Sequence, residues 1–204
     1  MTGASSDRPE KQPELPPIAA RPEREHIKGF SIPFMALRLG ALHFLKLAHK
    51  AQAQPTDPEQ GFHWDTYALA AQVFAAMAAE AQLNTYGLVR FGENLYATDE
   101  FRNRGPVKRL KRIGLRSVGV QIADHDPLVL GLRSLLAKRN PIVHMQADEE
   151  AFDKDGHIIR PAPPLPEHLV DAPRAIVEME EFLRGFAAWV GKHDIENWTY
   201  VMPW

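Results

Sequence analysis

One run of residues constrains the fold more than any other: "DTYALAAQVFAAMAAEAQLNTYGLVRF", residues 65–91. It is rich in alanine, a strong helix former, and apolar residues occur nearly all round the helix that it would make. Such a helix has little surface to give to water, so neighbours must cover it on most sides. We therefore expect this segment, capped by Asp65 or Thr66, to be the central helix of an all-α domain.

Three other long segments have apolar residues at helical spacing. Two of them also carry start signals, Asp126 followed by Pro127, and Asp171 followed by Pro173, which are typical of a helix N-cap and first turn. Four long helices with modest connections predict an up-and-down four-helix bundle. The three segments are residues 33–53, 127–139 and 171–193.

Shorter elements fill the connections. A loop through residues 92–105 leads to a short basic helix, residues 106–114. Between the last two long helices, an Asp155-Gly156 pair lies between short apolar runs, which predicts a small hairpin or an irregular loop. The fold class is therefore an all-α bundle with a short basic helix and a small hairpin or loop insertion.

Composition bounds the class of protein. The chain has 204 residues, a net charge of −2 and no cysteine, which excludes disulfides, thiolate metal sites and cysteine nucleophiles. Residues 1–28 are rich in proline and charge and predict a flexible tail, and residues 29–204 predict one helical domain. No apolar run approaches the roughly 20 residues of a membrane helix, and no secretory signal is visible, so we expect a cytoplasmic protein without a membrane partner.

The segment "AKRNPIVHM", residues 137–145, departs from a simple core pattern. Arg139 is the next member of an apolar helical stripe, where a charge is costly unless it is paired or reaches water. Asn140 and Pro141 follow, and proline lacks an N–H and crowds the preceding turn, so we expect a break at which Asn140 caps a new turn. The preceding members of the stripe are Leu128, Leu132 and Leu135.

A kink at Pro141 would matter because Arg139 and His144 lie about 140° apart on an unbroken helix. Brought to one cleft, they would combine a permanent cation of bidentate phosphate geometry with a side chain that titrates near neutral pH. A purely structural explanation competes with this one. An arginine near a helix C-terminus favours the helix dipole, and a lone histidine is more often packed than catalytic.

Glu80 and Asn84 are four residues apart, hence on one face of the predicted central helix. A buried carboxylate needs a cationic partner, and Arg139 on the third long helix is one candidate. The alternative partners are Arg38 and Arg133, which would only fix the helix register. The sequence leaves these two possibilities equally open.

The segment "KRNPIVHM" resembles the signature of the HEPN superfamily, which is an arginine, a polar residue, three more positions and a histidine at the end of the third bundle helix. The segment "AAMAAEAQLNTYG" resembles the Glu-x-x-x-Asn helix that is common in HEPN-like bacterial proteins. With the order of the helices, the resemblance covers most of residues 31–193. It implies a homodimer whose two Arg/His pairs face each other across a cleft that, in active members, cleaves RNA without a metal ion.

Carried over to this chain, the resemblance implies that Arg139 holds the scissile phosphate and that His144 moves a proton, as base on the ribose 2′-hydroxyl or as acid toward the leaving oxygen. Asn140 would orient the phosphate or the histidine, and Glu80 joins the candidate site as the partner of the arginine. We expect no metal ion and no other cofactor, because the remaining histidines show no ligand spacing.

Active members often serve as toxins or in antiphage defence, so an antitoxin protein is among the implied partners. Many toxin members carry a tyrosine two residues after the histidine. Gln146 takes that position here, which argues against regulation by modification of the tyrosine. The first expectation is a homodimeric, metal-independent endoribonuclease, and the alternative is a non-catalytic helical dimer that binds RNA, a nucleotide or a protein partner.

The short basic helix offers a second candidate surface. Three cations spaced four residues apart line one of its faces, and a fourth lies beside them, which suggests a track for an RNA backbone. The competing interpretation is a solvated charged face, since charged residues mostly stay exposed. The four cations are Lys108, Arg109, Arg112 and Arg116. The aromatic C-terminal stretch, residues 196–204, is expected to pack against the bundle or a second subunit.

Overall fold

The computed structural model describes residues 18–19, 33–53, 61–98, 100–101, 103–143 and 168–202. Within these ranges the chain is helical and contains no strand, as the sequence predicted for the fold class. The helices are α1 (Pro33–Ala53), α2 (Gly61–Tyr96), α3 (Pro106–Val118), α4 (Pro127–Val143), α5 (His168–His193) and the 3-10 helix η3 (Ile195–Tyr200).

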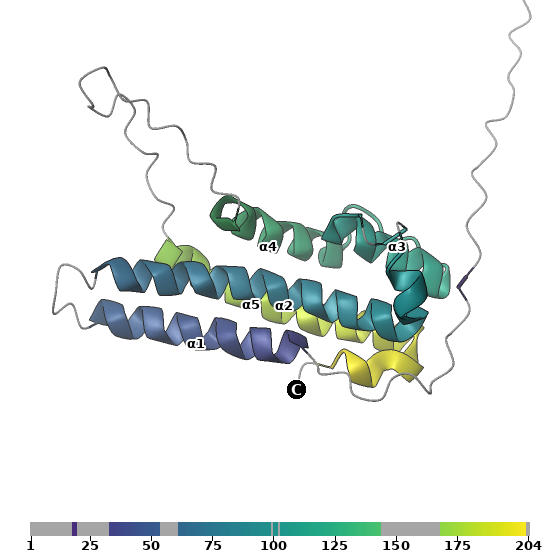
Figure 1. Cartoon of the computed structure of the whole chain (residues 1–204), viewed down its shortest axis with the longest axis horizontal. Coiled ribbons are helices and arrows are strands. Elements are labelled where there is room, and N and C mark those ends of the chain that lie inside the picture. Colours follow the sequence, from purple (N-terminus) through teal and green to yellow (C-terminus); the bar gives the residue numbers. More distant parts are fainter. Residues whose placement is uncertain are drawn as a thin grey trace, which may run out of the picture.

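The four long helices run alternately up and down, with α2 at the centre (Figure 1). α1 lies against α2 and α5 on one side of the bundle, and α4 lies against the same two helices on the other side. α3 crosses the end of α2 and contacts the start of the α4 region, while η3 packs against α5 and α2. The prediction of a central helix covered on most sides is therefore confirmed.

Small side chains explain how closely α1 and α2 approach each other. A Cβ on Gly40 of α1 would lie 2.6 Å from the ring of Phe74 on α2, so only glycine fits at that contact. Fully buried alanines from both helices also lie in this region of the core, and their short side chains let the two backbones pack tightly. These alanines include Ala41, Ala48, Ala68, Ala71 and Ala75.

α2 does not end at Phe91, where the apolar pattern stops. Gly92 adopts φ 72° and ψ 162°, a non-helical conformation that glycine reaches without the cost of a Cβ. The chain then resumes for one more turn and brings the ring of Tyr96 parallel to that of Phe91 at 6.5 Å between centroids. Both rings also contact Phe101, so the bend closes this end of the core with aromatic side chains.

Helix starts match the sequence at one of three places. The predicted cap of the central helix at Asp65 or Thr66 is wrong, because α2 begins at Gly61 and both residues lie inside it. α4 begins as predicted, because the Asp126 carboxylate accepts a 2.9 Å hydrogen bond from the amide of Leu128 and Pro127 occupies the first helical position. The predicted cap of the last long helix at Asp171 is wrong: α5 begins at His168, which places Asp171 in the first turn and Pro173 inside the helix. An acidic residue is favourable anywhere in the first turn, so this signal does not locate the cap.

α3 is longer than predicted. The sequence placed its end at Gly114, but the helix continues to Val118 and closes at Gly119, whose φ of 71° is the left-handed conformation of a C-cap. Gly114 lies inside the helix, and Ile122 packs directly over it. A Cβ at that position would lie 2.8 Å from the Ile122 Cδ1 atom. The glycine thus marks a close contact and not a helix end.

Both chain ends contribute to one end of the bundle. Ile18 and Ala19 belong to the segment predicted as a flexible tail, yet Ala19 is buried and its amide donates a 2.9 Å hydrogen bond to the carbonyl of Arg116. At the other terminus, Val201 is fully buried and Trp198 packs against the core, so the aromatic stretch docks on the bundle.

Several predicted features lie outside the described residues. They are the rest of the tail, the hairpin around Asp155-Gly156, His144 and Gln146. Among the described helices, none combines the length and apolar character that crossing a bilayer requires.

Candidate functional site

The structure joins the two sequence segments that resemble HEPN signatures. Nη1 of Arg139 donates a 2.8 Å hydrogen bond to Oε1 of Glu80, across the contact between α4 and α2. The side chains are 23% and 22% exposed, so the ion pair is partly buried but open to solvent on one side. Of the two possibilities that the sequence left equally open, the structure therefore shows the pairing of Glu80 with Arg139. The alternative partners are engaged elsewhere, Arg38 with Glu180 and Arg133 with Asp124.

Arg139 retains hydrogen-bonding capacity beyond this pair. A guanidinium carries five N–H donors, and within the described residues only Glu80 accepts from this one. Its Nε atom is buried without a hydrogen-bond partner in that part of the chain. A cation that is fixed by a carboxylate and still has donors in reserve can bind an oxyanion, because the carboxylate orients it without using up its N–H groups.

The neighbouring residue fixes the same end of α4 to the other helix that it touches. Nζ of Lys138 lies 2.7 Å from both carboxylate oxygens of Glu178 on α5 and 2.8 Å from the hydroxyl of Ser134. Two successive residues therefore tie α4 to α5 and to α2. This arrangement restrains the backbone that carries Arg139.

The predicted helix break at Asn140 and Pro141 is wrong, because α4 continues to Val143. A proline inside a helix removes one hydrogen bond, here the bond to the carbonyl of Ala137, and crowds that carbonyl. Ala137 is exposed, so water can hydrate the freed carbonyl, and only three helical positions include or follow the proline. These circumstances make continuation inexpensive, and the expected kink toward His144 is not formed up to Val143.

The other expected site residues are distributed unevenly. The side chain of Asn140 is exposed, and it makes no hydrogen bond with the part of the chain that the structure describes. His144 lies beyond the last described residue of α4. Of the four residues predicted to form the catalytic site, the structure brings together Glu80 and Arg139.

Asn84 follows Glu80 on the same face of α2 but serves a different contact. Its Oδ1 accepts hydrogen bonds from Nη1 of Arg109 at 2.6 Å and from the hydroxyl of Tyr96 at 2.8 Å. Burial raises the pKa of Tyr96 to about 12, although the nearby guanidinium of Arg109 acts in the opposite direction. Arg109 also donates to the carbonyls of Phe101 and Arg104, so this arginine braces the turn that follows α2.

The predicted RNA-binding cations of α3 divide into two groups. Arg112 and Arg116 both lie against the carboxylate of Glu100, at 2.5 Å and 2.9 Å from Oε1, and are mostly covered. Arg109 is held as described above. Lys108 alone of the four is exposed. The predicted set is thus not one continuous basic face.

A groove lies beside these cations, between α3 and the loop that precedes α4. It encloses about 670 Å³ and includes residues that the sequence did not single out. Hydrogen bonds from Lys111 and Arg133 hold the pKa of the Asp124 carboxyl at its rim below the ordinary range. The groove is lined by Arg104, Lys108, Lys111, Arg112, Leu115, Gln121, Ile122, Ala123, Asp124 and His125.

A buried polar network near the C-terminal end of α2 also escaped sequence analysis. Arg90 is only 3% exposed, donates to the carbonyls of Ala19 and Ser117, and lies 3.4 Å from the carboxylate of Asp194. That carboxylate accepts a 2.8 Å hydrogen bond from Tyr86 and a 3.0 Å one from Asn197. Burial, above all, raises the pKa of Tyr86 well above its ordinary value, and the Asp194 charge adds to the effect.

The signal for this network was present but weak. Arg90 interrupts the apolar run near its end, in the same way as Arg139 extends an apolar stripe. Its partner Asp194 follows the last residue of α5, 104 positions away by residue number, so sequence spacing alone could not pair them.

Within the described ranges, no group of three or more histidine and carboxylate side chains is arranged to hold a metal ion. In comparisons with protein-family models, with curated protein sequences and with solved structures, the chain has no significant match.

Proposed function

We propose that this protein is a HEPN-like, metal-independent endoribonuclease that acts as a homodimer, with Arg139 as the phosphate-binding cation and His144 as the proton-transfer group. In this proposal Glu80 is a positioning residue that orients Arg139. A toxin or antiphage role, with an antitoxin protein as partner, would follow from the same activity.

One observation carries the proposal. The Glu80–Arg139 ion pair connects two segments that are 59 residues apart and that independently resemble HEPN signatures. The resemblance of each segment was identified without reference to the other segment. A direct contact between the two therefore supports a shared site. The pair is also partly exposed, as binding of a phosphate requires.

The chemistry would proceed through the ribose of the substrate. One imidazole takes the proton of the 2′-hydroxyl, the 2′-oxygen attacks phosphorus, and the bond from phosphorus to the 5′-oxygen breaks. A second group, such as His144 of the partner subunit, acts as the acid and protonates the leaving 5′-oxygen. The products are a cyclic 2′,3′-phosphate and a 5′-hydroxyl. The guanidinium of Arg139 stabilises the negative charge that grows on the phosphate oxygens. Because the nucleophile belongs to the substrate, no metal-activated water is required.

A second function is favoured by the continuous α4 helix. Without a break at Pro141, nothing in the described part of α4 turns its end toward a cleft beside Arg139. A non-catalytic HEPN-like dimer that binds RNA, a nucleotide or a protein partner would need the ion pair only as a fixed cationic contact.

The test is cleavage of structured RNA by the purified full chain in the presence of a chelator. We expect cleavage products with cyclic phosphate ends, and a loss of about 100- to 1,000-fold in rate in both Arg139→Ala and His144→Ala. Light scattering on the same samples should report the mass of two chains.

The matched control is Lys138→Ala. It removes the adjacent cation of α4, which pairs with Glu178, and should leave cleavage within about threefold of the parent, as expected for a partly exposed pair remote from the phosphate. Intact RNA across varied substrates, with binding retained, would support the non-catalytic dimer instead. Equal losses in Lys138→Ala and Arg139→Ala would show that the end of α4 merely has to be anchored.

A further inference from the structure

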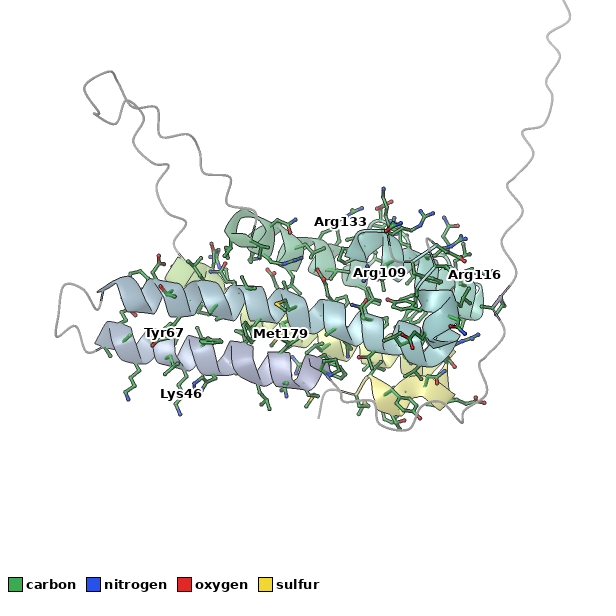
Figure 2. The ribbon with its side chains drawn as sticks, in the orientation of Figure 1. Lys46, Tyr67, Arg109, Arg116, Arg133 and Met179 are labelled. Carbon is green, nitrogen blue, oxygen red and sulfur yellow. The ribbon has the colours of Figure 1, made fainter. Side chains whose placement is uncertain are left out.

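The groove beside α3 is a strongly cationic concave surface. It is lined by four lysine and arginine side chains and one carboxylate, in a chain whose net charge is −2. Figure 2 shows Arg109, Arg116 and Arg133 on this side of the molecule, whereas Lys46 projects from α1 on the opposite side.

The ion pairs indicate which groove cations are available to a ligand. Glu100 is shared by Arg112 and Arg116, and Asp124 is shared by Lys111 and Arg133. In each case one carboxylate serves two cations, so a net positive charge remains. Arg104 and Lys108 are exposed and form no ion pair with a described carboxylate.

We propose that this groove binds the phosphodiester backbone of single-stranded RNA, which deepens the proposed function and rests on it. The set of contacting cations differs from the one expected from sequence. Arg104 and Lys111 join Lys108 and Arg112, while Arg109 and Arg116 support the groove from behind. His125, exposed at the rim, supplies a ring on which an unpaired base can stack.

The distribution of charge fits a strand better than a single phosphate group. A site for one phosphate needs donors that converge on one point, whereas these cations extend from the turn before α3 into its first two turns, at positions 104, 108, 111 and 112. Such spacing tracks a linear polyanion. The partly exposed side chain of Leu115, which lines the groove, can contact bases, which are accessible in a single strand and stacked away in a duplex.

The groove lies beside the start of the helix that carries Arg139, because its last lining residues directly precede α4. His125 precedes the start of α4, and Arg139 lies near its end, so at about 1.5 Å per residue the two are roughly 20 Å apart. A stacked strand covers that distance in about six nucleotides, at roughly 3.4 Å each. The groove would thus hold the substrate at some distance from the bond that is cleaved.

The experiment measures binding of a labelled oligouridylate to the full-length His144→Ala chain, in which cleavage does not interfere. At low salt, Lys108→Ala and Lys111→Ala should each weaken binding about three- to tenfold and reduce the slope of log K against log salt by about 0.7. Asp124→Asn should strengthen binding by a similar factor, because it releases Lys111 and Arg133. A gain in affinity cannot result from misfolding.

Lys46→Ala is the matched control, since it removes one exposed lysine from the far side of the bundle. It should leave the dissociation constant within about twofold, as expected for a charge farther away than a Debye length. Equal effects of Lys46→Ala and Lys108→Ala, or no gain with Asp124→Asn, would overturn the proposal. So would binding to phosphatidylserine vesicles through these residues without binding to RNA.

The two proposals can fail separately. Groove-dependent RNA binding in a parent chain that never cleaves RNA would leave the groove assignment standing and remove the ribonuclease. Cleavage that depends on Arg139, with RNA binding indifferent to all groove variants, would do the reverse.

Discussion

Two arginines of this bundle interrupt apolar patterns, and the protein uses them in opposite ways. Arg90, at the end where both termini dock, is 3% exposed and is surrounded by two carbonyls and the carboxylate of Asp194. Arg139, toward the other end of the bundle, is 23% exposed and has one described partner, Glu80. Protein groups therefore surround the guanidinium of Arg90, whereas the guanidinium of Arg139 is oriented by Glu80 but remains partly open to solvent.

The difference teaches how to separate a structural charge from a candidate site. A fully buried ion is tolerated only when protein groups replace its hydration, and a set of such groups leaves no room for a ligand. A partly exposed ion with spare donors keeps some of its water and can exchange it for an oxyanion. This criterion supports the proposal that Arg139 belongs to the functional site, whereas Arg90 holds Ala19 and the segment around Asp194 in place.

The largest effect should come from Arg90→Met. It keeps the apolar volume but leaves the carboxylate of Asp194 buried without its cation, which typically costs about 3–5 kcal/mol. Arg139→Met should cost no more than about 1 kcal/mol, because Glu80 can turn to water. Denaturant unfolding followed by circular dichroism measures both free energies. Equal losses of unfolding free energy in the two variants would show that Arg90 and Arg139 do not differ in structural role.

A smaller effect should come from Glu80→Gln, which keeps an oxygen acceptor for Arg139 but removes the charge. If Glu80 only positions the arginine, cleavage should fall by no more than about tenfold, and Glu80→Ala, without the acceptor, should fall further. Rate measurements over a range of pH compare the two. A Gln variant as inactive as Arg139→Ala would mean that the carboxylate itself transfers a proton.

The smallest effect concerns alkaline pH and the aromatic end of α2. The unfolded chain loses each tyrosine proton near pH 10, while Tyr96 in the folded chain keeps it to about 12. The folded state therefore binds more protons in this window, and its stability is complete below pH 10 and declines as the pH rises toward 12. At pH 11 the loss from Tyr96 should be about 1 kcal/mol.

Tyr86 adds to this decline in the same direction, since burial also raises its pKa. The variant Tyr96→Phe should show a shallower fall of the unfolding free energy between pH 9 and 11 than the parent. An unchanged slope would show that the hydroxyl of Tyr96 is not the group that titrates.

The sequence succeeded where the pattern is local and repeated. The apolar residues at helical spacing in residues 171–193 form a buried stripe, and the cap at Asp126 forms. The stripe consists of Ile176, Met179, Leu183, Phe186 and Val190. It failed where two signals look alike. Gly114 imitates a helix end, Asp171 imitates a cap and Pro141 imitates a break, because the same residue types also serve close packing, the first turn and the last turn.

The sequence alone determined the helical class, the order of the long helices and the need for a cationic partner at Glu80. Each of these follows from residues that are neighbours in the sequence, through helix periodicity or through the cost of a charge in an apolar segment. Only the tertiary structure decided that the partner is Arg139, that Arg90 and Asp194 meet, and that Arg109 and Arg116 face inward while Arg104 and Lys111 border a groove. These outcomes depend on which helix faces cross at which height, and that geometry emerges only when all the helices pack together.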